Sequence, residues 1–256
     1  MLLKIISGGL VGIAFGFVLQ RTRFCMTGGF RDMYIAKNNT LFYAFLIAIT
    51  VESVGVLSLI KLGIVSSPYE DYSVLGAIIG SYLFGIGIVL AGGCATGTWY
   101  RAAEGLIGSW VALFFYMLSA ASMKYGALQF LNQAISKYWV VNDNLAGQLG
   151  ISVWYFVLLL VIVTILLVIR ELNKPKKIVA TLAPKYKGIR HLLFEKQYHK
   201  FWAGFVIGLI ALIAWPASEF TGRTGGLGIT TPSANLISYV ATGDINLLNW
   251  GVFLIL

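Results

Sequence analysis

The sequence predicts an all-α, polytopic membrane protein built as an inverted repeat of transmembrane helices, some of them broken or re-entrant and carrying cysteine. Three observations lead to this prediction. The 256-residue chain is 58% hydrophobic and only 11% charged, with a mean hydropathy of +0.82, whereas soluble domains carry about 25% charged residues. Its apolar residues gather in long runs. Two of these runs break at short glycine-containing segments, each of which holds one of the two cysteines.

A helix that crosses a bilayer needs roughly 17–25 apolar residues. The runs that meet or approach this length are Leu2–Leu19, Thr40–Leu62, Val74–Ala91, Gly105–Met123, Ile151–Arg170 and the shorter Phe201–Pro216. The first run lacks a cleavage site of small residues, so we expect a retained helix rather than a signal peptide. A seventh run begins near Ile245 and is still apolar at Leu256. We therefore expect the chain to be C-terminally incomplete.

Charge predicts how these helices are oriented. Residues 170–200 contain nine Lys or Arg and two Glu, a net charge of +7, and the positive-inside rule places such a loop in the cytoplasm. Because successive helices cross the membrane in alternating directions, the acidic turn 68–71 is then expected outside. The same alternation places on the inner side the basic residues Arg21, Arg23, Arg31, Lys37 and Arg101. Residues 124–141 mix aromatic and basic side chains, which predicts an external amphipathic helix. The overall charge of +9 is thus explained by the membrane and does not indicate a nucleic-acid partner.

The order of the predicted helices divides the chain into three parts. Residues 1–123 form a first repeat, 124–200 hold the external segment, a linking helix and the basic loop, and 201–256 begin a second repeat. Because a single helix separates the two repeats, the helices of the second repeat must have the opposite orientation in the membrane, as in many secondary transporters. A Thr-Gly-Gly core follows an arginine in both sets, at residues 27–29 and 224–226.

Cys94 stands in the segment Gly92-Gly93-Cys94-Ala95-Thr96. Two glycines allow positive φ and a close approach of the backbone to a ligand, and a helix that starts after the turn would point free N–H groups at an anion. The alternative is that the glycines serve close helix packing and that the cysteine is a small buried hydrophobe. The charged side chains of Arg101 and Glu104 downstream favour the functional interpretation.

Cys25 follows Arg21 and Arg23 and is followed by Thr27, Arg31 and Asp32. Arginines at membrane depth usually face a cavity, a partner or a substrate path. The alternative is a cytoplasmic loop whose arginines bind lipid headgroups beside an incidental thiol. Asp32 is expected to form an ion pair with Arg31 or Arg21.

Glu52 is the carboxylate that lies well inside a predicted span. We expect it first to join helices through an ion pair and second to couple protons. The pair Trp215-Pro216 is predicted to end its helix at the interface.

The remaining polar residues argue against other classes of protein. Two cysteines without a nearby histidine cannot complete a structural zinc site, and reduced thiols are expected on the cytoplasmic side. His191 and His199 lie in the basic loop and are expected to be solvated. We find no phosphate loop, paired catalytic carboxylates or nucleophile–base pattern, so the sequence predicts neither an enzyme, a metal nor a cofactor. Arginines and helix N-termini instead favour a small anion, toward which a neutral thiol is a weak donor.

Segments 20–32 (QRTRFCMTGGFRD) and 91–102 (AGGCATGTWYRA) together resemble the YeeE/YedE sulfur-transport family. The resemblance covers the N-terminal half closely and the region after residue 201 loosely. It implies an inner-membrane protein of hourglass shape that takes up thiosulfate past three successive cysteines at a central constriction. Cys25 and Cys94 match the first two, and the third has no counterpart up to Leu256.

The resemblance also implies a small cytoplasmic sulfur-carrier protein, for which the basic loop 170–200 is a possible docking surface; attraction to anionic lipids explains the same loop equally well. Three other functions stay open at this point. The cysteines could form persulfides in a membrane sulfur-transferase component, the substrate could be a selenium compound, or the chain could be an accessory subunit with incidental thiols.

Overall fold

The structure is a computed structural model that describes residues 1–66, 72–141, 147, 150–174 and 198–256. The predicted acidic turn at 68–71, His191 and most of the basic loop lie outside the described residues.

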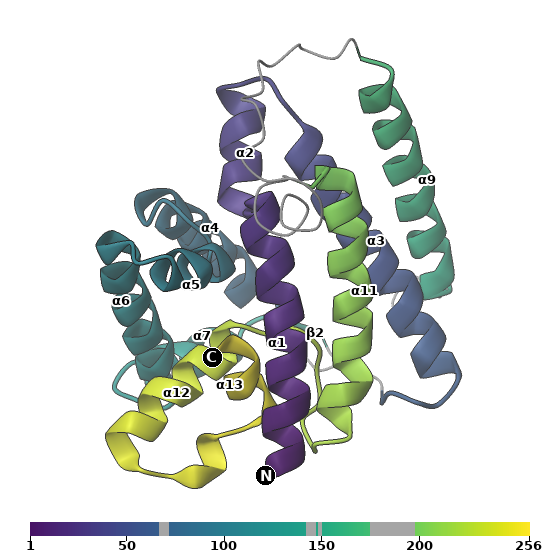
Figure 1. The fold of residues 1–256 in the computed structure, drawn as a ribbon. Coiled ribbons are helices and arrows are strands. Elements are labelled where there is room, and N and C mark those ends of the chain that lie inside the picture. The colour runs from purple at the N-terminus through teal and green to yellow at the C-terminus, as the bar shows by residue number, and fades with distance from the viewer. Residues whose placement is uncertain (67–71, 142–146, 148–149, 175–197) are drawn as a thin grey trace.

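Helices dominate the described chain (Figure 1). In order they are α1 Leu2–Thr22, α2 Met26–Tyr34, α3 Thr40–Lys61, α4 Val74–Leu90, α5 Ala95–Ala103, α6 Ile107–Lys124, α7 Gln129–Ser136, α9 Val153–Leu172, α11 Lys200–Glu219, α12 Thr230–Thr242, the 3-10 turn η1 Ile245–Leu247 and α13 Trp250–Ile255.

Six helical stretches among the described residues are long and apolar enough to cross a membrane. They reproduce the six predicted spans to within a few residues at most ends, which confirms a multi-pass membrane protein. Two of them, Leu2–Tyr34 and Val74–Ala103, each join two helices of the chain. The first contains Cys25 at the joint and the second contains Cys94, as the sequence predicted for broken helices.

The C-terminal part differs from the prediction in three places. Pro216 does not end α11, which continues to Glu219 because a proline in the last turn leaves only one backbone bond unmade. No continuous helix starts at Ile245, where a 3-10 turn precedes the short helix α13. Helix α12 was not predicted at all, although its first-turn Pro232 and its left-handed Gly243 (φ 72°) are typical helix boundaries.

The predicted external amphipathic helix is shorter than expected. Only Gln129–Ser136 is helical, and Val140–Val141 instead forms strand β2, antiparallel to β1 at Tyr72–Ser73. Trp139, which follows α7 and immediately precedes β2, takes a positive φ of 52°. The fold is therefore helical with one minimal two-stranded sheet.

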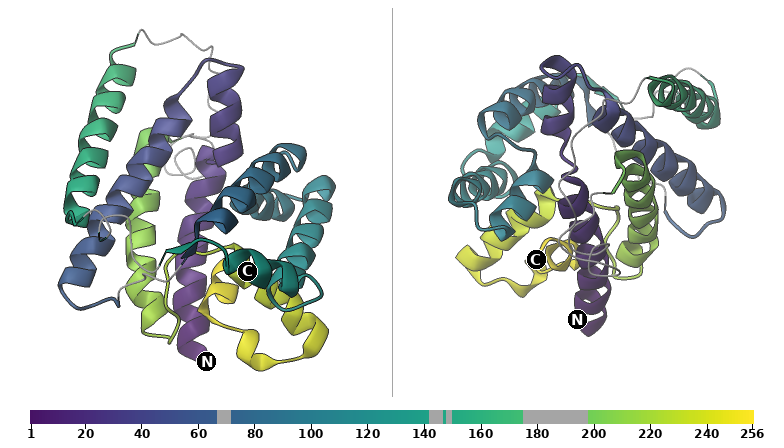
Figure 2. Two further views of the ribbon diagram at one scale, coloured as in Figure 1. Left: turned by 180° about the vertical axis from the view of Figure 1, so that it is seen from behind. Right: turned by 45° about the horizontal axis from the view of Figure 1, so that its top comes forward.

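Helix α1 lies between two groups of helices (Figures 1 and 2). On one side α3 packs against α11, with α9 outside α3; on the other stand α4, α5 and α6, with α12 against α6. Small residues permit the closest contacts. A Cβ at Gly204 of α11 would lie 2.2 Å from the carbonyl oxygen of Ala44 in α3, and one at Gly12 of α1 would lie 2.3 Å from that of Leu254 in α13. Such close backbone contact is characteristic of helix packing in membranes.

Candidate functional site

The first helix break turns the chain at Arg23 and places Cys25 at the start of α2. The hydroxyl of Thr22 donates to the carbonyl of Val18, and Arg23 adopts the left-handed conformation with φ 49° and ψ 45°. Cys25 follows in extended conformation as the N-cap of α2. Its side chain is only 2% exposed. The thiol is therefore buried inside the protein, at the break between the end of α1 and the start of α2.

The second break is built around Gly92, whose φ of +66° lets the chain leave α4. Arg101 reaches back from α5, and its Nη1 donates to the carbonyl of Gly92 at 2.6 Å. Cys94 is the N-cap of α5, and its Sγ accepts the backbone N–H of Gly97 at 3.3 Å. Arg101 thus stabilises the Gly-Gly-Cys turn directly, a role that its distance along the sequence did not reveal.

The two breaks bring the cysteines together. Sγ of Cys25 and Sγ of Cys94 lie 3.6 Å apart although 69 residues separate them, and both thiols are free. Gly97 makes this approach possible, because a Cβ there would lie 2.9 Å from Sγ of Cys25 and 3.5 Å from Sγ of Cys94. The sequence singled out both cysteines but missed Gly97. The signal for it was only its place as the third glycine of the segment Gly92-Gly93-Cys94-Ala95-Thr96-Gly97.

Other predicted residues lie on or next to α2 and α5, the helices that begin at the two cysteines. The hydroxyl of Thr27 is buried and bonds to no group among the described residues. Thr96 and Glu104 line a cavity of about 680 Å³ between α1, α5 and α13. Gly93 is buried, with the Arg101 guanidinium 3.3 Å from where its Cβ would stand.

The charged residues are arranged differently from the expectation in one respect. Arg31 pairs with Asp32 at 3.1 Å on the exposed end of α2, as predicted. Arg21 is half-buried and Arg23 is exposed. Glu52, however, does not form the expected ion pair with any of the described residues. Its carboxylate accepts the indole N–H of Trp215 at 3.2 Å, so the group joins α3 to α11 as a hydrogen-bond acceptor.

Hydrogen bonds also connect the first half of the chain to α12. Trp99 Nε1 donates to the hydroxyl of Ser233 at 3.1 Å, and the Tyr116 hydroxyl donates to that of Thr230 at 2.8 Å. Farther along, Tyr125 donates to the side chain of Asn235 at 2.7 Å. The sequence did not indicate these contacts, because α12 itself was not predicted.

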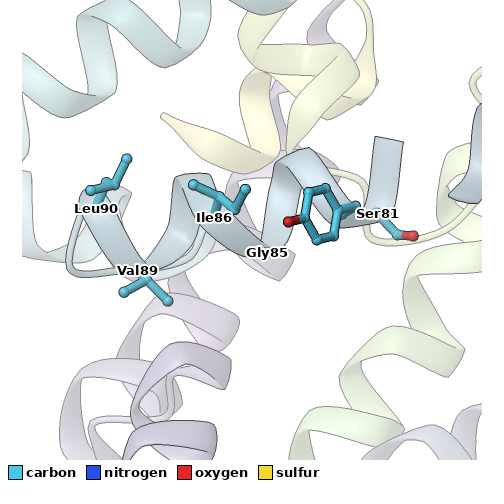
Figure 3. A pocket seen from close by; sticks show the side chains of 6 residues that line it. Ser81, Gly85, Ile86, Val89 and Leu90 are labelled. Atoms are coloured by element: carbon cyan, nitrogen blue, oxygen red, sulfur yellow. The ribbon is translucent and has the colours of Figure 1, made fainter. Parts of the chain in front are cut away.

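A separate apolar depression of about 510 Å³ lies on α4, away from the thiols, and is lined by Ser81, Tyr82, Gly85, Ile86, Val89 and Leu90 (Figure 3). Helix α4 has no buried residue. This exposed apolar surface is what a helix facing lipid presents. No three metal-binding side chains gather anywhere in the described part of the chain. His199, exposed, caps α11 by accepting the N–H of Phe201 at 3.3 Å.

Fold and site together define a multi-pass membrane protein with paired thiols at two helix breaks. Residues 21–256 match the family described as sulphur transport. The chain is 54% identical to the thiosulfate transporter TsuA of Escherichia coli over all 256 residues, which span 73% of that relative. It is 31% identical to TsuA of Spirochaeta thermophila, with 95% of this chain and 72% of the relative aligned. The probable transporter YedE of Escherichia coli is 42% identical over 101 residues, 40% of this chain and 25% of the relative.

This chain therefore belongs to the sulphur transport family, whose named relatives are transporters and not enzymes.

Proposed function

We propose that this protein is a transporter of the bacterial inner membrane that takes up thiosulfate, passing it along the thiols of Cys25 and Cys94. The observation that carries the proposal is the 3.6 Å separation of two free thiols at the joints of two broken helices. Non-helical backbone at membrane depth survives only where protein buries it or where it lines a water-filled passage. A thiol pair at such a joint is suited to contact a substrate.

The chemistry of the pair fits a soft anion that must pass through. A neutral S–H group is a weak donor, and a site on a transport path has to release its ion as readily as it binds it. Cys25 and Cys94 cap α2 and α5, so the positive ends of both helices begin at the thiols. The hydroxyl of Thr27, which has no hydrogen-bond partner among the described residues, and the exposed Arg23 add polar groups near Cys25. Thr96, Arg21 and Glu104 are further groups that we assign to the surroundings of the path.

The larger arrangement proposed here is an inverted repeat with a constriction at the thiols. Its parts are residues 1–123, 124–200 and 201–256, with residues 170–200 in the cytoplasm because of their +7 charge. We also propose that this basic loop receives a small cytoplasmic sulfur-carrier protein, which would take over the incoming sulfur. Support for the transported species comes from the relatives named thiosulfate transporter.

Uptake of sulfur-labelled thiosulfate by cells that lack other routes tests the function. The wild-type protein is expected to give uptake above the empty vector, and Cys25→Ser and Cys94→Ser are expected to abolish it at equal expression. Full uptake in both serine variants would contradict the role assigned to the thiols. Equal uptake by wild type and empty vector would remove thiosulfate as the substrate.

Thiol mass analysis distinguishes this path from persulfide chemistry. During uptake, the proposed path leaves both cysteines as unmodified thiols, whereas a sulfur transferase would leave sulfur covalently attached to one of them. Detection of a persulfide on Cys25 or Cys94 in transporting membranes would contradict the non-covalent path and favour the transferase.

A further inference from the structure

Arg223 belongs to the Thr-Gly-Gly segment that resembles the Cys25 segment, yet the thiol path gives it no role. It lies in the loop between α11 and α12, half-buried. Burial lowers the pKa of its guanidinium below the ordinary value, but arginine remains charged in proteins. The molecule therefore holds a positive charge in a partly dehydrated position.

No carboxylate of the described residues neutralises this charge. The ion pairs of the described chain join Arg31 to Asp32 and Lys174 to Glu171. The acid nearest in sequence, Glu219, instead accepts hydrogen bonds from the backbone N–H and hydroxyl of Ser66 at 2.8 and 2.6 Å. A half-buried cation without a carboxylate partner is costly, and charged residues inside membrane proteins often mark substrate or ion paths.

The loop holds the guanidinium by one edge only. Nη1 of Arg223 donates to the carbonyl of Gly226 at 3.0 Å and lies 3.5 Å from the hydroxyl of Ser218. That hydroxyl in turn donates to the backbone carbonyl of Arg223 at 3.0 Å. The guanidinium lies near the Trp250 ring, with its central carbon 5.9 Å from the ring centroid. Nε and Nη2 donate to no group of the described residues, and these atoms form a pair of parallel donors suited to two oxygens of one anion.

A second unsatisfied polar group lies beside the first. Oδ1 of Asn249 is buried and accepts no hydrogen bond among the described residues. The place where Gly251 would carry a Cβ is 3.3 Å from both Asn249 Oδ1 and Arg223 Cζ, so the two side chains converge on this glycine. Because the two ends of an amide group are interchangeable by rotation, Asn249 can present its NH2 donors to the same point.

The position of Arg223 separates it from the thiols. Its neighbour Trp250 donates to the hydroxyl of Ser7 in α1 at 3.1 Å. Ser7 lies 15 residues before the end of α1 at Thr22, which corresponds to about 22 Å along the helix. Cys25 stands just beyond that other end. Under the orientation proposed above, Arg223 is on the outer side, where an incoming anion arrives first.

We propose that Arg223, with Asn249, is an outer binding site that captures the sulfur oxyanion before it reaches Cys25 and Cys94. The inference rests on the proposed function for the identity of the ion, thiosulfate. Arg223 contacts the sulfonate oxygens through Nε and Nη2. A site of this kind determines the affinity for the substrate, whereas the thiols determine passage.

Kinetics of labelled thiosulfate uptake test the proposal with three variants of the protein. Arg223→Gln removes a charge-assisted pair of hydrogen bonds and is expected to raise KM about tenfold or more, with the maximal rate changed less than about twofold. Arg223→Lys keeps the charge and is expected to recover part of the affinity. Lys61→Gln removes an exposed cation at the end of α3 and is expected to leave KM unchanged.

Ser218→Ala separates the binding role from a structural one. It removes the hydroxyl that holds the Arg223 backbone but leaves the charge, so it is expected to change KM little. An unchanged KM in Arg223→Gln at normal expression would overturn the proposal. Equal losses of maximal rate in Arg223→Gln and Ser218→Ala, with KM constant, would do so as well, because they would show that Arg223 only holds the loop.

A binding measurement keeps this test separate from the test of transport. Thiosulfate is expected to raise the melting temperature of the purified wild-type protein in detergent but not that of Arg223→Gln. If wild-type cells fail to take up thiosulfate, the transport proposal falls. The site itself still stands if thiosulfate or sulfate stabilises only the protein with Arg223. Equal stabilisation of both proteins, or of neither, would overturn it.

Discussion

At the scale of single residues, Gly97 decides how closely the two thiols approach. It donates its backbone N–H to Sγ of Cys94, and its missing side chain leaves space for Sγ of Cys25. The atoms that would meet a new Cβ belong to the short side chains of Cys25, which is buried, and Cys94, which is half-buried. Moving them away from the Cβ would change the separation of the two thiols. The glycine is therefore part of the site although it contributes no reactive group.

Replacing Gly97 by alanine is expected to reduce thiosulfate uptake at least several-fold, since the added Cβ would stand 2.9 Å from Sγ of Cys25 and so force the two thiols apart. Uptake at matched expression measures this. Gly108→Ala is the control, because nothing lies within 4 Å of the Cβ position at Gly108. Equal uptake by the two alanine variants would show that the thiol separation is unimportant.

The same geometry predicts a disulfide under oxidising conditions. Two sulfurs 3.6 Å apart need only a small movement to bond. A diazene oxidant such as diamide is expected to convert both thiols to a disulfide, the oxidant taking up two electrons and two protons. Uptake should fall and return after reduction.

Alkylation of the denatured protein followed by mass analysis measures this reaction. Oxidised wild type should take up no alkylating reagent, whereas Cys25→Ser and Cys94→Ser should each take up one equivalent. Full alkylation of the oxidised wild type would contradict the separation seen between the sulfurs.

At the scale of helices, glycine allows α3 and α11 to touch along their backbones. A Cβ at Gly204 would lie 2.2 Å from the carbonyl oxygen of Ala44, and one at Gly208 would lie 2.7 Å from Cβ of Val51. The hydrogen bond between Glu52 and Trp215 joins the same two helices. The close contact between α3 and α11 thus depends on small residues. The hydrogen bond between Glu52 and Trp215 fixes how the two helices are aligned along each other.

Gly204→Ala is expected to destabilise the protein by about 1–3 kcal/mol, because a side chain forced against a backbone carbonyl must push α11 from α3. Thermal unfolding in detergent should show a lower midpoint. Gly80→Ala on α4, where nothing lies within 4 Å of the Cβ position, provides the matched control. A midpoint equal to that of the control would contradict the close packing of α3 on α11.

At the scale of the whole molecule, the orientation proposed from charge makes opposite predictions for the two ends of the helix bundle. Lys61 ends α3 and is expected outside, whereas Lys174 follows α9 and is expected in the cytoplasm. In a Cys25→Ser, Cys94→Ser background, K61C should react with a membrane-impermeant maleimide in intact cells. K174C should react only after the cells are opened. The reverse pattern would contradict the cytoplasmic assignment of the basic loop.

Much of this arrangement could be predicted because it depends on local properties of the chain. Hydropathy located the six spans, since a helix in lipid must be apolar over its length. Glycine and polar residues located the breaks at Cys25 and Cys94, since they interrupt an apolar run. Helix α12 escaped prediction because its buried polar residues, such as Ser233 and Asn235, do not form an apolar run; Trp99 and Tyr125 satisfy them.

By itself, therefore, the sequence determined that this is a multi-pass membrane protein with two thiols at helix breaks, because span length and chain interruption are local. Only the tertiary structure decided that Cys25 meets Cys94, that Glu52 binds Trp215, and that Arg223 converges with Asn249 on Gly251. These pairs come from different helices. Their distances depend on how helix surfaces pack, and the order of residues along one helix does not specify which surface of another it will meet.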